Sequence, residues 1–173
     1  MSLDATINKA SVLIEALPYL QSFRGHTFLI KMGGSAMEDP GLVRKVMRDI
    51  VFLEVAGINP VIVHGGGKAI SAAMKEAGLE AQFIGGFRVT TPAAIEIVEQ
   101  TLSHTINPGL VNMITEFGGK AHGIPGTEVF KGRRIQATDD DGQQVDIGRV
   151  GEAVSCQLDA IEQIIKAETV PVI

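Results

Sequence analysis

The sequence has one cysteine, one tyrosine and no tryptophan, and its shortages exclude several classes of protein. The lone Cys156 excludes a disulfide framework within the chain and a cysteine metal site, so we expect it to be a small buried side chain. No apolar run approaches the ~20 residues that a membrane-spanning helix needs. The first residues, MSLDATINKA, lack the basic and then apolar layout of a secretory signal. We therefore expect a cytoplasmic protein with no membrane partner.

Basic residues are also too few for a nucleic-acid surface, so no nucleic-acid partner is expected. The chain has 15 lysines and arginines against 20 aspartates and glutamates, a formal net charge of −5, whereas nucleic-acid binding needs a basic patch or stripe. Hydrophobic residues make up 45% of the chain and charged residues 20%, as in ordinary globular proteins. A length of 173 residues allows one domain with a sizeable core.

What the chain does have is an alternation of apolar strands and helical segments. Strands are expected at 26–32, 58–63 and 169–173, and helices at 40–57, 67–78 and 155–168. Helices of this length between apolar strands are typical of βαβ units. The sequence therefore predicts an α/β fold with a mainly parallel sheet.

The other segments are less regular. Residues 4–22 have apolar positions near helical spacing, although Pro18 is expected to kink or end that helix. A hairpin with a glycine bend is expected at 81–91, and a long helix at 91–119 with a kink near 107–109. A strand, turn and strand are expected at 127–148, because Asp-Gly at 141–142 favours a tight hairpin turn.

Residues 61–70, VIVHGGGKAI, place three glycines between a strand and a helix. Three interpretations are open: a cradle for a phosphate or carboxylate at a helix N-terminus, an esterase oxyanion hole, or a turn without a ligand. The oxyanion hole needs a G-x-S-x-G elbow, which is absent. The Walker and dinucleotide glycine motifs are absent as well.

A second junction of this kind favours the anion cradle. LIKMGGSAM at 29–37 also ends an apolar strand in glycines, and Lys31 precedes them. Lys31 should lie close to His64, because both end strands of a parallel sheet at the same edge. A lysine there suits a phosphoryl group in transfer. Arg88, in an apolar alternating segment, suits a carboxylate held by two parallel hydrogen bonds.

These segments, in this order, resemble the amino acid kinase family, and within it the acetylglutamate kinases. The resemblance runs from about residue 24 to residue 173 and rests on LIKMGGSAM, VIVHGGGKAI, GFRVTTPAAIEIVEQTL and VDIGRVGEAV…PVI. It implies a three-layer α/β/α sandwich, with 24–173 as the acetylglutamate-binding lobe and the C-terminal nucleotide lobe absent. The N-terminal ASVLIEALPYLQSF is similar to the extra helix of the arginine-inhibited, hexameric branch. Segment 1–23 would then be an oligomerisation helix.

The resemblance also implies roles for particular residues. Lys31 would balance charge on the phosphoryl group, and Gly33 and Gly34 would approach the nucleotide phosphates. Gly66 and Gly67 would hold the carboxylate that is phosphorylated, and Arg88 the α-carboxylate of N-acetyl-L-glutamate. The reaction would use ATP with Mg²⁺ in arginine biosynthesis, and no metal site built from this chain's own side chains is expected. A homodimer or homohexamer is implied, with arginine as a possible inhibitor of a full-length form.

Two departures from the family pattern matter. Lys68 stands where proline is usual, which adds a positive charge to a helix start that favours negative charge. It could add a contact to a carboxylate or alter the choice of ligand. The expected absence of the nucleotide lobe leaves two hypotheses: part of an acetylglutamate kinase, or a non-catalytic module that binds acetylglutamate or an amino acid.

Overall fold

The computed structural model describes residues 3–173 and is built on a four-stranded sheet. Its strands, in spatial order, are β1 (Thr27–Met32), β2 (Asn59–His64), β10 (Val170–Val172) and β5 (Ala121–Gly123). Each neighbouring pair runs parallel, which confirms the predicted sheet. Strand β5 was not predicted, because its sequence AHG is short and carries no apolar run.

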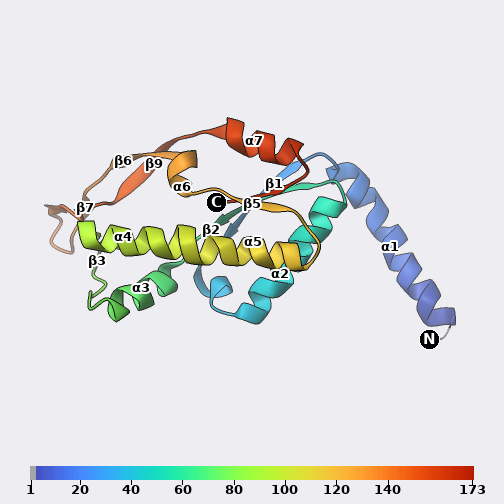
Figure 1. Cartoon of the computed structure of the whole chain (residues 1–173), viewed down its shortest axis with the longest axis horizontal. Helices are drawn as coiled ribbons and strands as arrows, with labels where there is room; N and C mark the ends of the chain where they lie inside the picture. Colours follow the sequence, from blue (N-terminus) through green and yellow to red (C-terminus); the bar gives the residue numbers. More distant parts are fainter. Residues whose placement is uncertain (1–2) are drawn as a thin grey trace.

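Helices cover both faces of this sheet, which confirms the predicted three layers (Figure 1). Alternate residues of β2 face opposite sides, as the strand geometry requires. Ile62 packs in one cluster with α2 (Pro40–Val55) and α5 (Asn107–Glu116), whereas Val61 packs in another with α7 (Leu158–Lys166). Burial of each such valine or isoleucine stabilises the fold by about 1.5–3 kcal/mol.

The predicted long helix at 91–119 is present, but its irregular part differs from the prediction. It consists of α4 (Pro92–Thr101), a π-helical turn η2 (Leu102–Ile106) and α5, which form one rod across the molecule (Figure 1). In η2 the N–H of Asn107 donates to the carbonyl of Leu102. Pro108 has no N–H and would crowd an ordinary α-turn. A wider turn at 102–106 therefore takes the place of the kink predicted at 107–109.

The first glycine junction continues into a 3₁₀ turn, η1 (Gly34–Met37), and the second into α3 (Gly67–Glu76). The predicted hairpin at 81–91 is confirmed as β3 (Phe83–Ile84) and β4 (Phe87–Arg88). Helix α3 packs against α4 through the buried side chains of Ile70, Met74 and Ala94.

The predicted hairpin at 127–148 is larger than expected. After a short helix, α6 (Gly126–Val129), strand β6 (Phe130–Arg134) pairs with β9 (Gly151–Cys156), and β7 (Ala137–Thr138) pairs with β8 (Gln144–Val145). The turn at Asp141 and Gly142 is confirmed, and Gly142 has a φ of +81°.

Two predictions about the end of this hairpin are wrong. The helix expected at 155–168 begins only at Leu158, because β9 continues to Cys156. The side chain of Cys156 is exposed rather than buried. All of β9 is exposed, so its sequence carries no alternation of apolar and polar residues that would have predicted a strand.

The predicted N-terminal helix is α1 (Leu3–Phe23), which continues through Pro18 rather than ending there. Residues 1 and 2 of the predicted segment 1–23 lie outside the described residues. Helix α1 extends away from the rest of the fold (Figure 1). Its large apolar side chains Leu3, Ile7, Val12, Leu13, Ile14, Leu17, Tyr19 and Phe23 are exposed. Within residues 3–173, no helix is long and apolar enough to cross a membrane.

Candidate functional site

The two glycine junctions leave the sheet side by side. In the register of β1 and β2, Lys31 lies opposite Val63 and Met32 opposite His64. The N–H of Gly65 donates to the carbonyl of Met32 over 2.7 Å, which ties the second junction to the end of β1. The predicted proximity of Lys31 to the end of β2 is therefore confirmed.

At the first junction the side chain of Lys31 folds over the glycine turn. A Cβ atom on Gly33 would lie 3.4 Å from Cε and 3.5 Å from Nζ of Lys31. Gly34 has a φ of +58°, a left-handed conformation that favours glycine. Lys31 is exposed and, among residues 3–173, makes no ion pair or side-chain hydrogen bond. Its ammonium group is free to meet an anion.

The glycines of the second junction have different surroundings. A Cβ atom on Gly66 would lie 2.5 Å from Cδ1 of Ile106 and 2.9 Å from Cδ2 of Leu102, so a side chain there would displace η2 side chains. A Cβ atom on Gly67 would have no protein atom within 4 Å. Gly66 is the N-cap of α3 and offers no side chain to cap it, and the first turn of α3 contains no acidic residue. Its first N–H groups are therefore available to an anion.

Arg88 lies against the first turn of α3. Its Nη2 donates to the carbonyl of Gly67 at 3.0 Å and to Oγ of Ser71 at 2.8 Å, and its Nη1 contacts Sδ of Met74 at 3.5 Å. The guanidinium also stacks over the ring of Phe83, 4.7 Å from its centroid. These contacts use three of the five N–H groups of the guanidinium. Arg88 is thus held in one orientation with donors left for a ligand.

A cavity of about 420 Å³ joins these parts. It is lined by Gly34, Met37, Glu38, Gly66, Gly67, Lys68, Ala69, Ser71, Phe83, Arg88 and Ile106. Four of the six predicted site residues line it, while Lys31 at the end of β1 and Gly33 on the adjoining turn are not in the lining. Its size and its mixture of apolar walls with a few polar groups are typical of a small-molecule site.

Several lining residues were not predicted from the sequence. Ser71 lies one helical turn after Gly67, a spacing that indicates a shared helix face once α3 is recognised. Glu38 pairs with Lys68 across 30 positions of the chain, so no local pattern indicates it.

His64 ends β2 beside the glycines. Burial lowers the pKa of His64 below its ordinary value of 6.5, although a contact with the carbonyl of Gly65 raises it in part. The imidazole is therefore neutral at pH 7. Positive charge at this edge comes from Lys31, Lys68 and Arg88 rather than from histidine.

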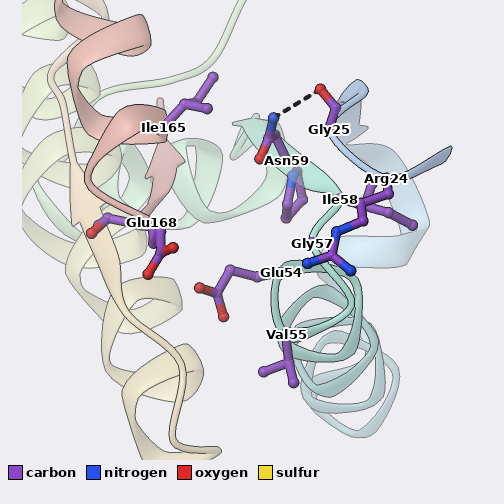
Figure 2. Close-up of a pocket in the computed structure, with 11 residues that line it drawn as sticks. Arg24, Gly25, Glu54, Val55, Gly57, Ile58, Asn59, Ile165 and Glu168 are labelled. Carbon is purple, nitrogen blue, oxygen red and sulfur yellow. Dashed lines mark hydrogen bonds between the residues drawn. The ribbon is translucent and has the colours of Figure 1, made fainter. Parts of the chain in front are cut away.

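A second hollow, of about 470 Å³, lies at the opposite edge of the sheet (Figure 2). Arg24, Glu54 and Glu168 line it, together with Asn59 at the start of β2. The side chain of Asn59 donates to the carbonyl of Gly25 over 3.2 Å, the contact drawn in Figure 2. No sequence pattern predicted this hollow, because its charged residues come from three distant segments.

The model of the amino acid kinase family matches residues 26–173. The chain belongs to the amino acid kinase family. It is 60% identical over 167 residues to an acetylglutamate kinase of Akkermansia muciniphila, covering 96% of this chain and 56% of that protein. It is 46% identical over 167 residues to an acetylglutamate kinase of Thermoanaerobacter pseudethanolicus, covering 96% and 54%. The chain thus spans about half the length of these amino acid kinase relatives.

A solved structure supports the same fold. The N-acetylglutamate synthase of Neisseria gonorrhoeae, determined with coenzyme A and N-acetyl-glutamate, aligns with a TM-score of 0.74. Its sequence identity is 20%, and the alignment covers 99% of this chain and 37% of that one. At this identity the match supports the amino acid kinase fold alone.

Proposed function

We propose that this chain forms the acetylglutamate-binding part of a kinase that transfers the γ-phosphoryl group of ATP to N-acetyl-L-glutamate in arginine biosynthesis. The observation that carries the proposal is Arg88, held by Gly67 and Ser71 at the uncapped start of α3. A guanidinium and free backbone N–H groups that line one cavity suit a ligand with two carboxylates. The acetylglutamate kinases with 46% and 60% identity support the choice of ligand.

In this proposal each predicted residue has one task. Arg88 binds the α-carboxylate, and the N–H groups of Gly66 and Gly67 hold the γ-carboxylate in place. Lys31 neutralises charge on the phosphoryl group, and Gly33 and Gly34 allow the nucleotide phosphates to approach the backbone. Mg²⁺ bound to ATP would screen the phosphate charge.

The chemistry then needs no general base. A carboxylate is ionised near pH 7, so its oxygen attacks the γ-phosphorus directly. The bond from that phosphorus to the β–γ bridging oxygen breaks, ADP leaves, and an acyl phosphate remains. The contribution of this chain is the positioning of the two reactants and the neutralisation of charge.

The test is calorimetric titration of the chain with N-acetyl-L-glutamate. We expect saturable binding that Arg88→Ala weakens by roughly 30-fold or more, since truncating one partner of a desolvated charged contact costs about 2 kcal/mol or more. Arg48→Ala is the matched control, because Arg48 lies exposed on α2, away from the cavity. Absence of binding to folded protein, or equal loss in both variants, would refute the proposed site.

Catalysis is tested separately, by a coupled assay for ADP release in the presence of acetylglutamate and MgATP. The expected result for an enzyme is turnover that depends on both substrates. Turnover above background would exclude the alternative, a module that binds acetylglutamate without phosphorylating it.

We also propose that α1 associates with a second copy of the chain. The exposed apolar side chains of this helix, which extends away from the fold, support an oligomerisation role. Deletion of residues 1–22 is expected to lower the mass measured by light scattering. An unchanged mass would count against that role.

A further inference from the structure

An ion pair bridges the two glycine turns at the mouth of the candidate site. Nζ of Lys68 lies 2.5 Å from Oε2 of Glu38. Glu38 directly follows η1, and Lys68 is the second residue of α3. Both side chains line the cavity that also contains Gly67 and Arg88. The pair therefore lines the cavity and also connects the segment after η1 to the start of α3.

Stability does not explain this pair. The side chain of Lys68 is 77% exposed and that of Glu38 is 34% exposed, and exposed ion pairs contribute little to stability. The first turn of α3 also disfavours a positive charge, since the helix dipole is positive there. A lysine at this position thus has an electrostatic cost within its own helix.

The charge of the cavity offers a reason for the lysine. Glu38 places a carboxylate in a cavity whose other polar groups, Arg88 and the start of α3, suit anions. An unpaired Glu38 would repel a ligand with two carboxylates. When Glu38 is paired with Lys68, the two side chains together contribute no net charge. Arg88 then gives the residues that line the cavity a net charge of +1.

We propose that Lys68 sets the charge selectivity of this cavity by neutralising Glu38, and that it does so as a positioning residue without contacting the ligand. In this arrangement Glu38 anchors the lysine and ties the turn after β1 to the start of α3. The inference rests on the proposed function, because it takes the ligand to be a dicarboxylate such as N-acetyl-L-glutamate.

The test is a double-mutant cycle read by calorimetry. Its members are the wild-type chain, Lys68→Met, Glu38→Gln and the double variant, each titrated with N-acetyl-L-glutamate and with N-acetyl-L-glutamine, which has one carboxylate fewer. Lys68→Met is expected to weaken acetylglutamate binding about tenfold, and acetylglutamine binding by a smaller factor, because a single charge is repelled less. Glu38→Gln alone is expected to retain or tighten binding.

The decisive member is the double variant. With both charges removed, acetylglutamate binding is expected to return to within about threefold of the wild type. If the double variant stays as weak as Lys68→Met, the lysine contacts the ligand directly and the proposal is overturned. It is also overturned if Lys68→Met binds both ligands as the wild type does, or loses both equally.

Folding and the parent proposal are separated by two further measurements. Lys68→Arg keeps the charge and is expected to retain most of the acetylglutamate affinity, which provides the comparison if Lys68→Met does not fold by circular dichroism. A folded wild-type chain that binds no acetylglutamate would refute the proposed function, and this inference with it. Binding that is lost in Arg88→Ala but unaltered across the cycle would refute this inference alone.

Discussion

The two edges of the central sheet contain hollows of similar volume, about 420 and 470 Å³, but their glycines serve different purposes. At the edge shown in Figure 2, Gly25 and Gly57 have φ values of +79° and +81°, so the backbone turns themselves require glycine. At the other edge Gly34 also has a positive φ, +58°, but neither Gly66 nor Gly67 does. Packing against η2 explains Gly66, whereas among residues 3–173 no atom lies within 4 Å of a Cβ atom placed on Gly67. Because Gly67 also lines the cavity, the open space beside it is available to a ligand.

The charged groups differ in the same way. In the hollow of Figure 2, the side chains of Arg24, Glu54 and Glu168 form no ion pair or hydrogen bond within residues 3–173. At the glycine edge, Arg88 is held by two oxygens and Lys68 by Glu38. Orientation of charged groups before a ligand arrives lowers the entropy lost on binding. The edge that carries Gly66 and Gly67, the glycine edge, therefore has charged side chains better oriented to bind a ligand.

One substitution at each edge tests whether its glycine serves the backbone turn or a ligand. Gly57→Ala places a side chain at φ +81°, and we expect the free energy of unfolding to fall by about 1–2 kcal/mol, the cost of a left-handed alanine. Gly67→Ala should leave that free energy unchanged or slightly raised, because alanine favours helix. It should weaken acetylglutamate binding several-fold, since the new methyl group projects where no protein atom lies within 4 Å. Urea unfolding and calorimetric titration of both variants provide the measurements.

Two results would contradict this difference between Gly57 and Gly67. If Gly67→Ala binds acetylglutamate as well as the wild type, the third glycine of HGGG is not reserved for a ligand. If Gly57→Ala is as stable as the wild type, the left-handed turn is not what fixes glycine at that edge.

Sequence reasoning succeeded where one local pattern decides the structure. The run 58–63 predicted β2 because a buried parallel strand is apolar on both faces, and the run 26–32 predicted β1 through its β-forming residues although most of that strand is exposed. The glycine edge was predicted because strand ends in a parallel sheet meet at one edge. Strand β9 was missed because all of its residues are exposed. Whether such an exposed segment forms a strand depends on its tertiary contacts and not on its own sequence pattern.

The same limit applies to the candidate site. Lys31 could be selected from the sequence because it precedes the glycines that end an apolar strand, and Arg88 because a charged residue is unexpected in an apolar alternating segment. The partners Ser71 and Glu38 could not, because each depends on where a distant segment lies. The hollow of Figure 2 draws on residues from Arg24 to Thr169 and shows the limit most clearly.

The smallest expected effect concerns His64, a partly buried titratable group at the glycine edge. Burial lowers the pKa of His64 in the folded chain below the ordinary value of 6.5. Well above pH 6.5 the imidazole is neutral in both states, and no stability is lost. As the pH falls below 6.5, the unfolded chain takes up a proton that the folded chain resists, so the free energy of unfolding decreases until the folded pKa is passed.

His64→Gln removes this proton and should flatten the loss of stability between pH 7.5 and pH 5. The measurement is urea unfolding across that range, with exposed His104→Gln as the matched control that should retain the wild-type slope. A wild-type slope in His64→Gln would mean that other groups cause the acid sensitivity. A flattened slope in His64→Gln alone would assign the acid sensitivity to the partly buried imidazole that ends β2.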